Sequence, residues 1–202
     1  MGVDRVILRS FLSTLAAIVL LFAFMLVALI GLYPSTMMEI TYDLGMDASS
    51  IRYAERAYDW SGDEYFMAYA MEVAIGSENM RKIESCGERL IEDDDFAAYY
   101  AKRNEKLPED SMTYDQYIYG QVCVAKYKNG KKEDAVNKAF EWTGTNSFPK
   151  NNAVIAVLYS ALSGRDADTI NLIKGKMEQM QTESLSQNEK AEFDRVFALT
   201  NV

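Results

Sequence analysis

A single apolar run constrains this chain more than any other feature of its sequence. The run extends from Phe11 to Tyr33 without a charged residue, and its only polar side chains are Ser13 and Thr14. A helix rises about 1.5 Å per residue, so a helix of this length crosses the roughly 30 Å hydrocarbon core of a bilayer with its backbone hydrogen bonds satisfied internally. We therefore expect a transmembrane helix over residues 11–33.

The charges that flank the run predict its orientation. Arg5 and Arg9 precede it against one acid, Asp4, whereas the first charged residues after it are acidic. This Lys/Arg bias places residues 1–10 in the cytoplasm and residues 34–202 on the outer side of the cell membrane. A cleaved signal peptide is the alternative, but its apolar core is usually only about 7–15 residues long. We expect an uncleaved signal anchor and a single-pass protein.

Charge and composition restrict what the outer domain can do. The chain carries a net charge of −9, and because residues 1–33 contribute +1, residues 34–202 carry −10. Such a surface repels nucleic acid and favours basic or neutral protein partners. The sequence contains no His, which excludes Ser-His-Asp and Cys-His catalysis and His-ligated metals. We predict no cofactor, no metal site and no catalytic residue.

The two cysteines leave three alternatives open. Cys86 and Cys123 both fall on the predicted outer side, where a disulfide is chemically permitted. Each lies in a helical pattern, so both can equally be buried free thiols, and a reactive role is the third possibility.

Beyond the run, apolar residues recur with helical period almost everywhere, and the sequence predicts an all-α domain. Predicted helices include 47–60, a short extra helix over 96–104, 113–128, 131–142 and 151–163. Ser61, Ser77, Thr113 and Ser186 stand where they can cap the helices that follow them.

Four glycines punctuate this pattern. Gly45, Gly76, Gly130 and Gly164 each stand at a predicted helix end, with a second helix beginning within a few residues. Their spacings are 31, 54 and 34 residues, and an insertion around the extra helix accounts for the longer interval. The pattern predicts stacked antiparallel helical hairpins.

The segment from Cys123 to Val136 resembles the tetratricopeptide repeat, with a small residue, the aromatic Tyr127, Gly130 at the turn and Ala135 five residues later. Ser50, Arg81 and Thr169 stand where the other copies would need that Ala. The resemblance implies a partner-binding groove lined by the first helix of each pair. In the clearest copy, it points to Tyr114, Tyr117 and Gln121 as partner-binding residues.

Two classes of function follow. The first is a membrane-anchored interaction module that docks a protein or peptide at the outer face of the membrane; an accessory subunit of a membrane complex differs only in its partner. The second is a carboxylate-dependent hydrolase of cell-wall glycans, with an acid among Glu72, Glu92 and Asp93. It needs two carboxyl groups across a cleft, which a sequence cannot show.

Overall fold

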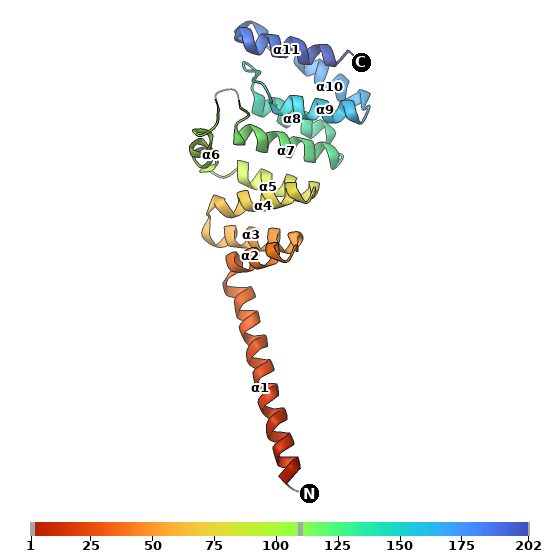
Figure 1. Ribbon diagram of the computed structural model, residues 1–202. Helices are drawn as coiled ribbons and strands as arrows, with labels where there is room; N and C mark the ends of the chain where they lie inside the picture. The colour runs from red at the N-terminus through yellow and green to blue at the C-terminus, as the bar shows by residue number, and fades with distance from the viewer. Residues whose placement is uncertain (1–2, 109–110, 202) are drawn as a thin grey trace. The chain divides into compact units, whose positions relative to one another are not determined.

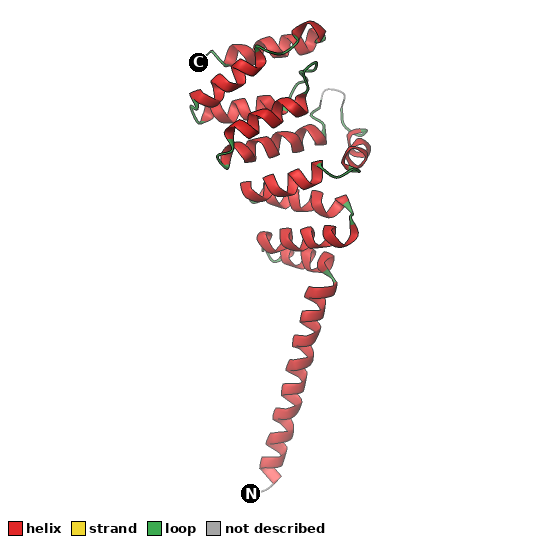
Figure 2. Ribbon diagram, turned by 180° about the vertical axis from the view of Figure 1, so that it is seen from behind, coloured by secondary structure: helices red, strands yellow, loops and turns green. Residues whose placement is uncertain are grey.

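A computed structural model describes residues 3–108 and 111–201 of the chain. Over these residues the regular structure is helical, and no strand is present (Figure 2). The predicted all-α class is confirmed.

The chain divides into two compact units at Gly62. The first holds three helices: α1 (Val3–Leu32), α2 (Pro34–Asp43) and α3 (Asp47–Ser61). The second holds the other helices of the described residues: α4 (Glu64–Gly76), α5 (Met80–Ile91), α6 (Phe96–Asn104), α7 (Tyr114–Lys128), α8 (Lys132–Thr143), α9 (Ala153–Ser163), α10 (Ala167–Met177), the 3-10 turn Thr182–Ser184 and α11 (Gln187–Leu199).

The first helix carries the apolar run and is exposed from Leu8 to Val27, while Ala28, Leu29 and Gly31 are half-buried. Its segment Leu8–Leu29 has a mean hydropathy of 2.7, and none of the most apolar window is buried. By length and composition this helix can cross a membrane. It ends at Leu32, and Tyr33 separates it from α2, whose first residue is Pro34.

The helices pack in consecutive pairs, as predicted. In the first unit α2 pairs with α3; in the second α4 pairs with α5, α7 with α8 and α9 with α10. Figure 1 shows these three pairs of the second unit stacked in chain order, with α11 beyond α10 and α6 at the side.

One turn geometry joins the helices of all four pairs. The first residue beyond each first helix's cap adopts a left-handed conformation, at Gly45 (φ +68°), Glu78 (+51°), Gly130 (+85°) and Arg165 (+52°). The N–H of this left-handed residue donates to the carbonyl of the residue three positions earlier, as Gly130 does to Tyr127. The N–H of the following residue donates to the carbonyl of the residue five positions before it, as Lys131 does to Lys126. All eight bonds are 2.8–3.1 Å long. These two bonds define the Schellman motif, which satisfies the free carbonyls at a helix end.

All four glycines stand at a helix end, as predicted, but two of them are not the left-handed residue of the turn. Gly76 is the last residue of α4, and Gly164 caps α9 in right-handed geometry, so the left-handed residues are Glu78 and Arg165 instead. Measured between left-handed residues, the intervals are 33, 52 and 35 residues.

Counting from the left-handed residue reveals buried positions that recur in every pair. The residue seven positions earlier is buried in all four pairs: Met38, Met71, Cys123 and Leu158. The residue five positions later is also buried in all four: Ser50, Ile83, Ala135 and Ile170. The equivalence of Arg81 and Thr169 with Ala135, predicted by counting from glycines, is therefore wrong, and Arg81 is exposed.

Two of the four predicted caps are correct. Thr113 and Ser186 form complete capping boxes with Gln116 and Glu189. Ser61 and Ser77 instead donate their hydroxyls to carbonyls four residues earlier, at 2.9 and 2.8 Å, and so close the preceding helix. Asp63 and Asn79 cap α4 and α5 in their place.

The extra helix α6 has the predicted bounds and lies in the 52-residue interval, where it is the inserted element. Cys86 and Cys123 are buried and unbridged, which agrees with the free-thiol interpretation.

Candidate functional site

The predicted partner-binding residues lie on the accessible side of α7. Tyr114 is 43% exposed and Tyr117 is 37% exposed, while Gln121 is half-buried. Their spacing of three and four residues places them on one helix face. They are surface residues of the second unit, as a docking role requires.

The other exposed large side chains of the second unit share this location. Within its described residues, the large apolar or aromatic side chains that are exposed lie on a first helix of a pair or just before α7: Tyr65, Met112, Tyr114, Tyr117 and Tyr159. The second helices α5, α8 and α10 expose none among their described residues. We call Tyr65, Tyr117 and Tyr159, one from each of α4, α7 and α9, the tyrosine face.

Tyr65 and Tyr117 also occupy the same place in the repeat, 13 residues before Glu78 and Gly130. Sequence reasoning selected Tyr117 as a partner-binding residue; it placed Tyr65 on a helix face with Tyr69 but selected neither Tyr65 nor Tyr159. Tyr65 could have been recognised by counting 13 residues back from the left-handed residue of its turn. The sequence did not reveal that residue, because in the second pair it is Glu78 and not Gly76.

The inserted helix α6 packs beside the tyrosine face. Its Tyr100 is buried and stacks on Tyr114 with ring centroids 6.3 Å apart. The Asn104 side chain accepts from the backbone N–H of Tyr114 at 2.9 Å and donates to Asp115 at 2.8 Å. These contacts fix the N-terminus of α7, and they give Tyr114 a structural role that Tyr117 does not share.

A cluster of charged groups lies between α5, α7 and α8. The Lys126 ammonium is 2.5 Å from Glu88 and 2.6 Å from Asp134, and it reaches Glu84 at 3.5 Å. Its side chain is only 4% exposed, and that of Glu84 only 7%. Ion pairs this deeply buried are costly to assemble and need complete hydrogen bonding.

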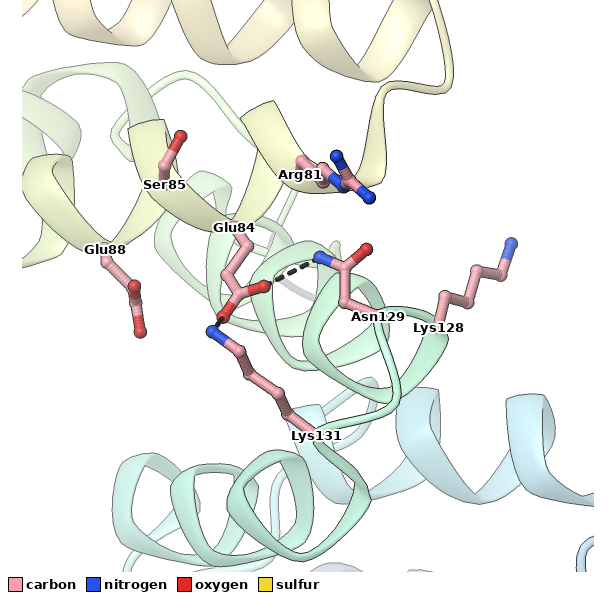
Figure 3. Close-up of a pocket in the computed structure, with 7 residues that line it drawn as sticks. All are labelled: Arg81, Glu84, Ser85, Glu88, Lys128, Asn129 and Lys131. Atoms are coloured by element: carbon pink, nitrogen blue, oxygen red, sulfur yellow. Dashed lines mark hydrogen bonds and ion pairs between the residues drawn. The ribbon is translucent and has the colours of Figure 1, made fainter.

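Glu84 obtains that hydrogen bonding from the turn of the third pair. Lys131 donates to one carboxylate oxygen at 2.6 Å, and the Asn129 amide donates to the other at 2.7 Å (Figure 3). These three residues line an open pocket with a volume of about 570 Å³. Arg81 and Lys128 line the same pocket (Figure 3).

The protonation states follow from these contacts. Burial raises the pKa of Glu84, but hydrogen bonds from Lys131 and Asn129 and the charge of Lys126 lower it by more, so the pKa ends below its usual value. Burial lowers the pKa of Lys126, but hydrogen bonds to Asp134 and Glu88 raise it by more. Both groups stay charged, so the cluster is suited to holding helices together and not to proton transfer.

The acids weighed for a hydrolase have local roles. Glu72 pairs with Arg103 of α6 at 3.8 Å, and Glu92 caps the end of α5. Asp93 accepts from the backbone N–H of Asp95 at 3.0 Å. Glu64, Asp93 and Asp95 do bring carboxylate oxygens within 4.8 Å of one another, but partly exposed acids at a helix junction are common without an ion.

Comparison with known proteins adds no family: no protein-family model, no curated protein and no solved structure matches the chain.

Proposed function

We propose that this protein is a membrane-anchored docking module whose helical repeats are tetratricopeptide-like and bind a protein or peptide along their first helices. The observation that carries the proposal is the location of the exposed tyrosines on α4, α7 and α9. Tyrosine is favoured in protein interfaces because it buries a large apolar ring around a polar tip.

The repeated turn supports the choice of repeat class. Left-handed residues 33 and 35 residues apart, with matching buried positions before and after them, resemble the 34-residue period of the tetratricopeptide repeat. In a stack of such pairs the first helices share one side of the domain, which brings residues distant in sequence into one docking face.

The anchor and its orientation form the second part of the proposal. The exposed apolar helix α1 serves as an uncleaved signal anchor, and the bias of Arg5 and Arg9 to its N-terminal side supports an orientation with residues 34–202 outside the cytoplasmic membrane. External protease should then remove a C-terminal tag in intact spheroplasts.

The acidic charge of residues 34–202 favours a basic or neutral polypeptide as the partner and disfavours nucleic acid. An accessory subunit of a membrane complex would use the same face. The two roles differ in whether the partner stays bound.

Photo-crosslinking in intact cells tests the docking function. A photoreactive residue replaces Tyr117 on α7, and the matched control replaces Asn137, which is exposed on the second helix α8. We expect a discrete crosslinked protein from position 117 and none from position 137. Equal products at both positions, or none at either, contradict docking through the first helices.

A further inference from the structure

The helix that follows the apolar span exposes an apolar stripe. Tyr33 is 58% exposed, Ile40 42% and Leu44 68%, and Met37 between them is half-buried. The spacings of four, three and four residues set these side chains one above another along α2. The backbone bonds from Met37 N–H to Tyr33 and from Leu44 N–H to Ile40 show that each pair is one helical turn apart.

The stripe is not the core face of α2. That face is formed by Met38 and Thr41, which are buried in the pair with α3. The Ser50 hydroxyl of α3 donates to the Met38 carbonyl at 3.0 Å and fixes how the two helices meet. Glu39 and Asp43 are exposed on a third, polar side. The helix is therefore amphipathic on its outer surface, with one polar and one apolar strip.

The chemistry of this exposed surface differs from that of the tyrosine face. The second unit exposes four tyrosines and one methionine among its described large side chains, whereas α2 and the residues that flank it expose Ile40, Leu44 and Met46 in addition to Tyr33 and Tyr42. Aliphatic side chains offer no polar group to a wet interface, and they suit the acyl-chain boundary of a bilayer.

We infer that α2 lies on the bilayer surface, with Tyr33, Met37, Ile40 and Leu44 inserted among the lipids beside the span. This inference rests on the proposed membrane anchor. The bilayer is the surface that covers the stripe, because α1 ends at Leu32 and the stripe begins at the next residue. No linker therefore separates the apolar stripe from the proposed membrane span. In Figure 1, α2 runs across the end of α1 and does not continue its axis.

The end of α3 adds the side chains that favour a membrane interface. Arg56 donates to the Gly31 carbonyl in the last turn of α1 at 3.2 Å, and its guanidinium lies 5.4 Å from the centre of the Trp60 ring. Trp60 is 55% exposed, although α3 buries Ile51, Ala54 and Ala57 on another face. Trp and Tyr concentrate at the level of lipid headgroups, where Arg can reach phosphates.

Lipid-depth quenching tests this placement in the full chain. The protein is reconstituted at one copy per phosphatidylcholine nanodisc, and an environment-sensitive fluorophore is attached at Ile40→Cys or Leu44→Cys. Glu39→Cys is the matched control on the polar side of the same helix, and Leu20→Cys reports the span. Cys86 and Cys123 are buried and do not compete for the label.

We expect lipid-borne quencher to reduce emission from positions 40 and 44 at least threefold more than from position 39. If position 20 is quenched but 40 and 44 match position 39, the inference is wrong while the anchor stands. If position 20 is also unquenched, the anchor fails and the inference with it. Quenching at 40 and 44 that requires two copies per disc would also overturn the inference, because a second copy would then cover the stripe.

Discussion

Lys126 and Glu84 face each other 3.5 Å apart at positions that most of the other helical pairs fill with small or aliphatic residues. Four residues before the left-handed turn, the other pairs hold Thr41, Ala74 and Ala161, all buried. Six residues after it, where the second pair has Glu84, the first and third have Ile51 and Val136, also buried, and the fourth has the exposed Asn171. The ion pair is thus a local replacement of core residues where α5 meets α7.

Removing one partner should therefore harm the fold more than removing both. Lys126→Ala leaves three carboxylates without their common cation and should lower the free energy of unfolding by about 3 kcal/mol. Adding Glu84→Ile, the residue that the first pair uses, should recover part of that loss because the sites are coupled. Urea denaturation of the full chain in micelles measures the cycle, and additive losses would contradict the coupling.

The sequence predicted the helices and their ends better than it predicted which residue of each turn is left-handed. Helical period and two capping boxes located α6, α7 and α11 closely, because those signals are local. The left-handed residues after α4 and α9 were not predicted, because Glu78 and Arg165 accept a conformation that costs a non-glycine residue only about 1–2 kcal/mol. Tertiary packing can offset that cost, and a sequence does not show it.

The charged cluster was missed for a related reason. A lysine between apolar residues of a helix is normally taken as exposed, and burial of Lys126 depends on three acids from α5 and α8. The Tyr117 prediction needed only one well-formed repeat. Its counterpart Tyr65 can be recognised only by counting from the left-handed residue of the second pair. That residue is Glu78, two positions after Gly76.

Gly87 is required for the close approach of α5 to α7. A Cβ built there would overlap Val122 Cγ2 and lie 3.2 Å from Met71 Cε. Gly to Ala inside a helix normally gains about 1 kcal/mol, but overpacking typically costs about 1–3 kcal/mol. We expect Gly87→Ala to lower the melting temperature in micelles, and Val122→Ala to restore part of it.

Gly120→Ala is the matched control, since its nearest neighbour would be Ala156 Cβ at an ordinary 3.6 Å. It should be neutral or stabilising. Equal losses from the two alanines would show that close packing is not the cause.

The left-handed turns predict opposite effects for two substitutions. Gly130 has φ +85°, so Gly130→Val should destabilise the domain by about 1 kcal/mol or more. Arg165 has φ +52°, so Arg165→Gly should stabilise it by up to about 1 kcal/mol. Thermal unfolding followed by circular dichroism measures both, and effects of the same sign would refute the conformational explanation.

Glu189 should make the domain sensitive to acid. Hydrogen bonds from the Ser186 hydroxyl, then from the backbone N–H groups of Ser186 and Phe148, lower the pKa of Glu189 to about 2. The folded pKa is below the ordinary 4.5, so the stabilisation is complete above pH 4.5 and is lost as the pH falls toward 2.

The melting temperature should therefore fall less between pH 5 and pH 2.5 in Glu189→Gln than in the unaltered chain, because the variant has already lost this contribution. Asp194→Asn, an exposed acid on the same helix, is the control and should keep the full dependence. A Glu189→Gln variant with the full acid dependence would show that this carboxylate is not its source.

The last prediction concerns the proposed docking face, and it distinguishes Tyr114 from Tyr117, which the sequence analysis treated together. Tyr114→Ala should weaken the packing of α6 as well as binding, because its ring stacks on Tyr100. Tyr117→Ala should leave helicity intact and weaken capture of the crosslinked partner by more than about 1 kcal/mol, or at least about fivefold. For a basic partner, association should also quicken at low salt. Asn137→Ala controls for general surface effects. If Tyr117→Ala folds and binds normally, the partner docks elsewhere; if it unfolds, the ring belongs to the core.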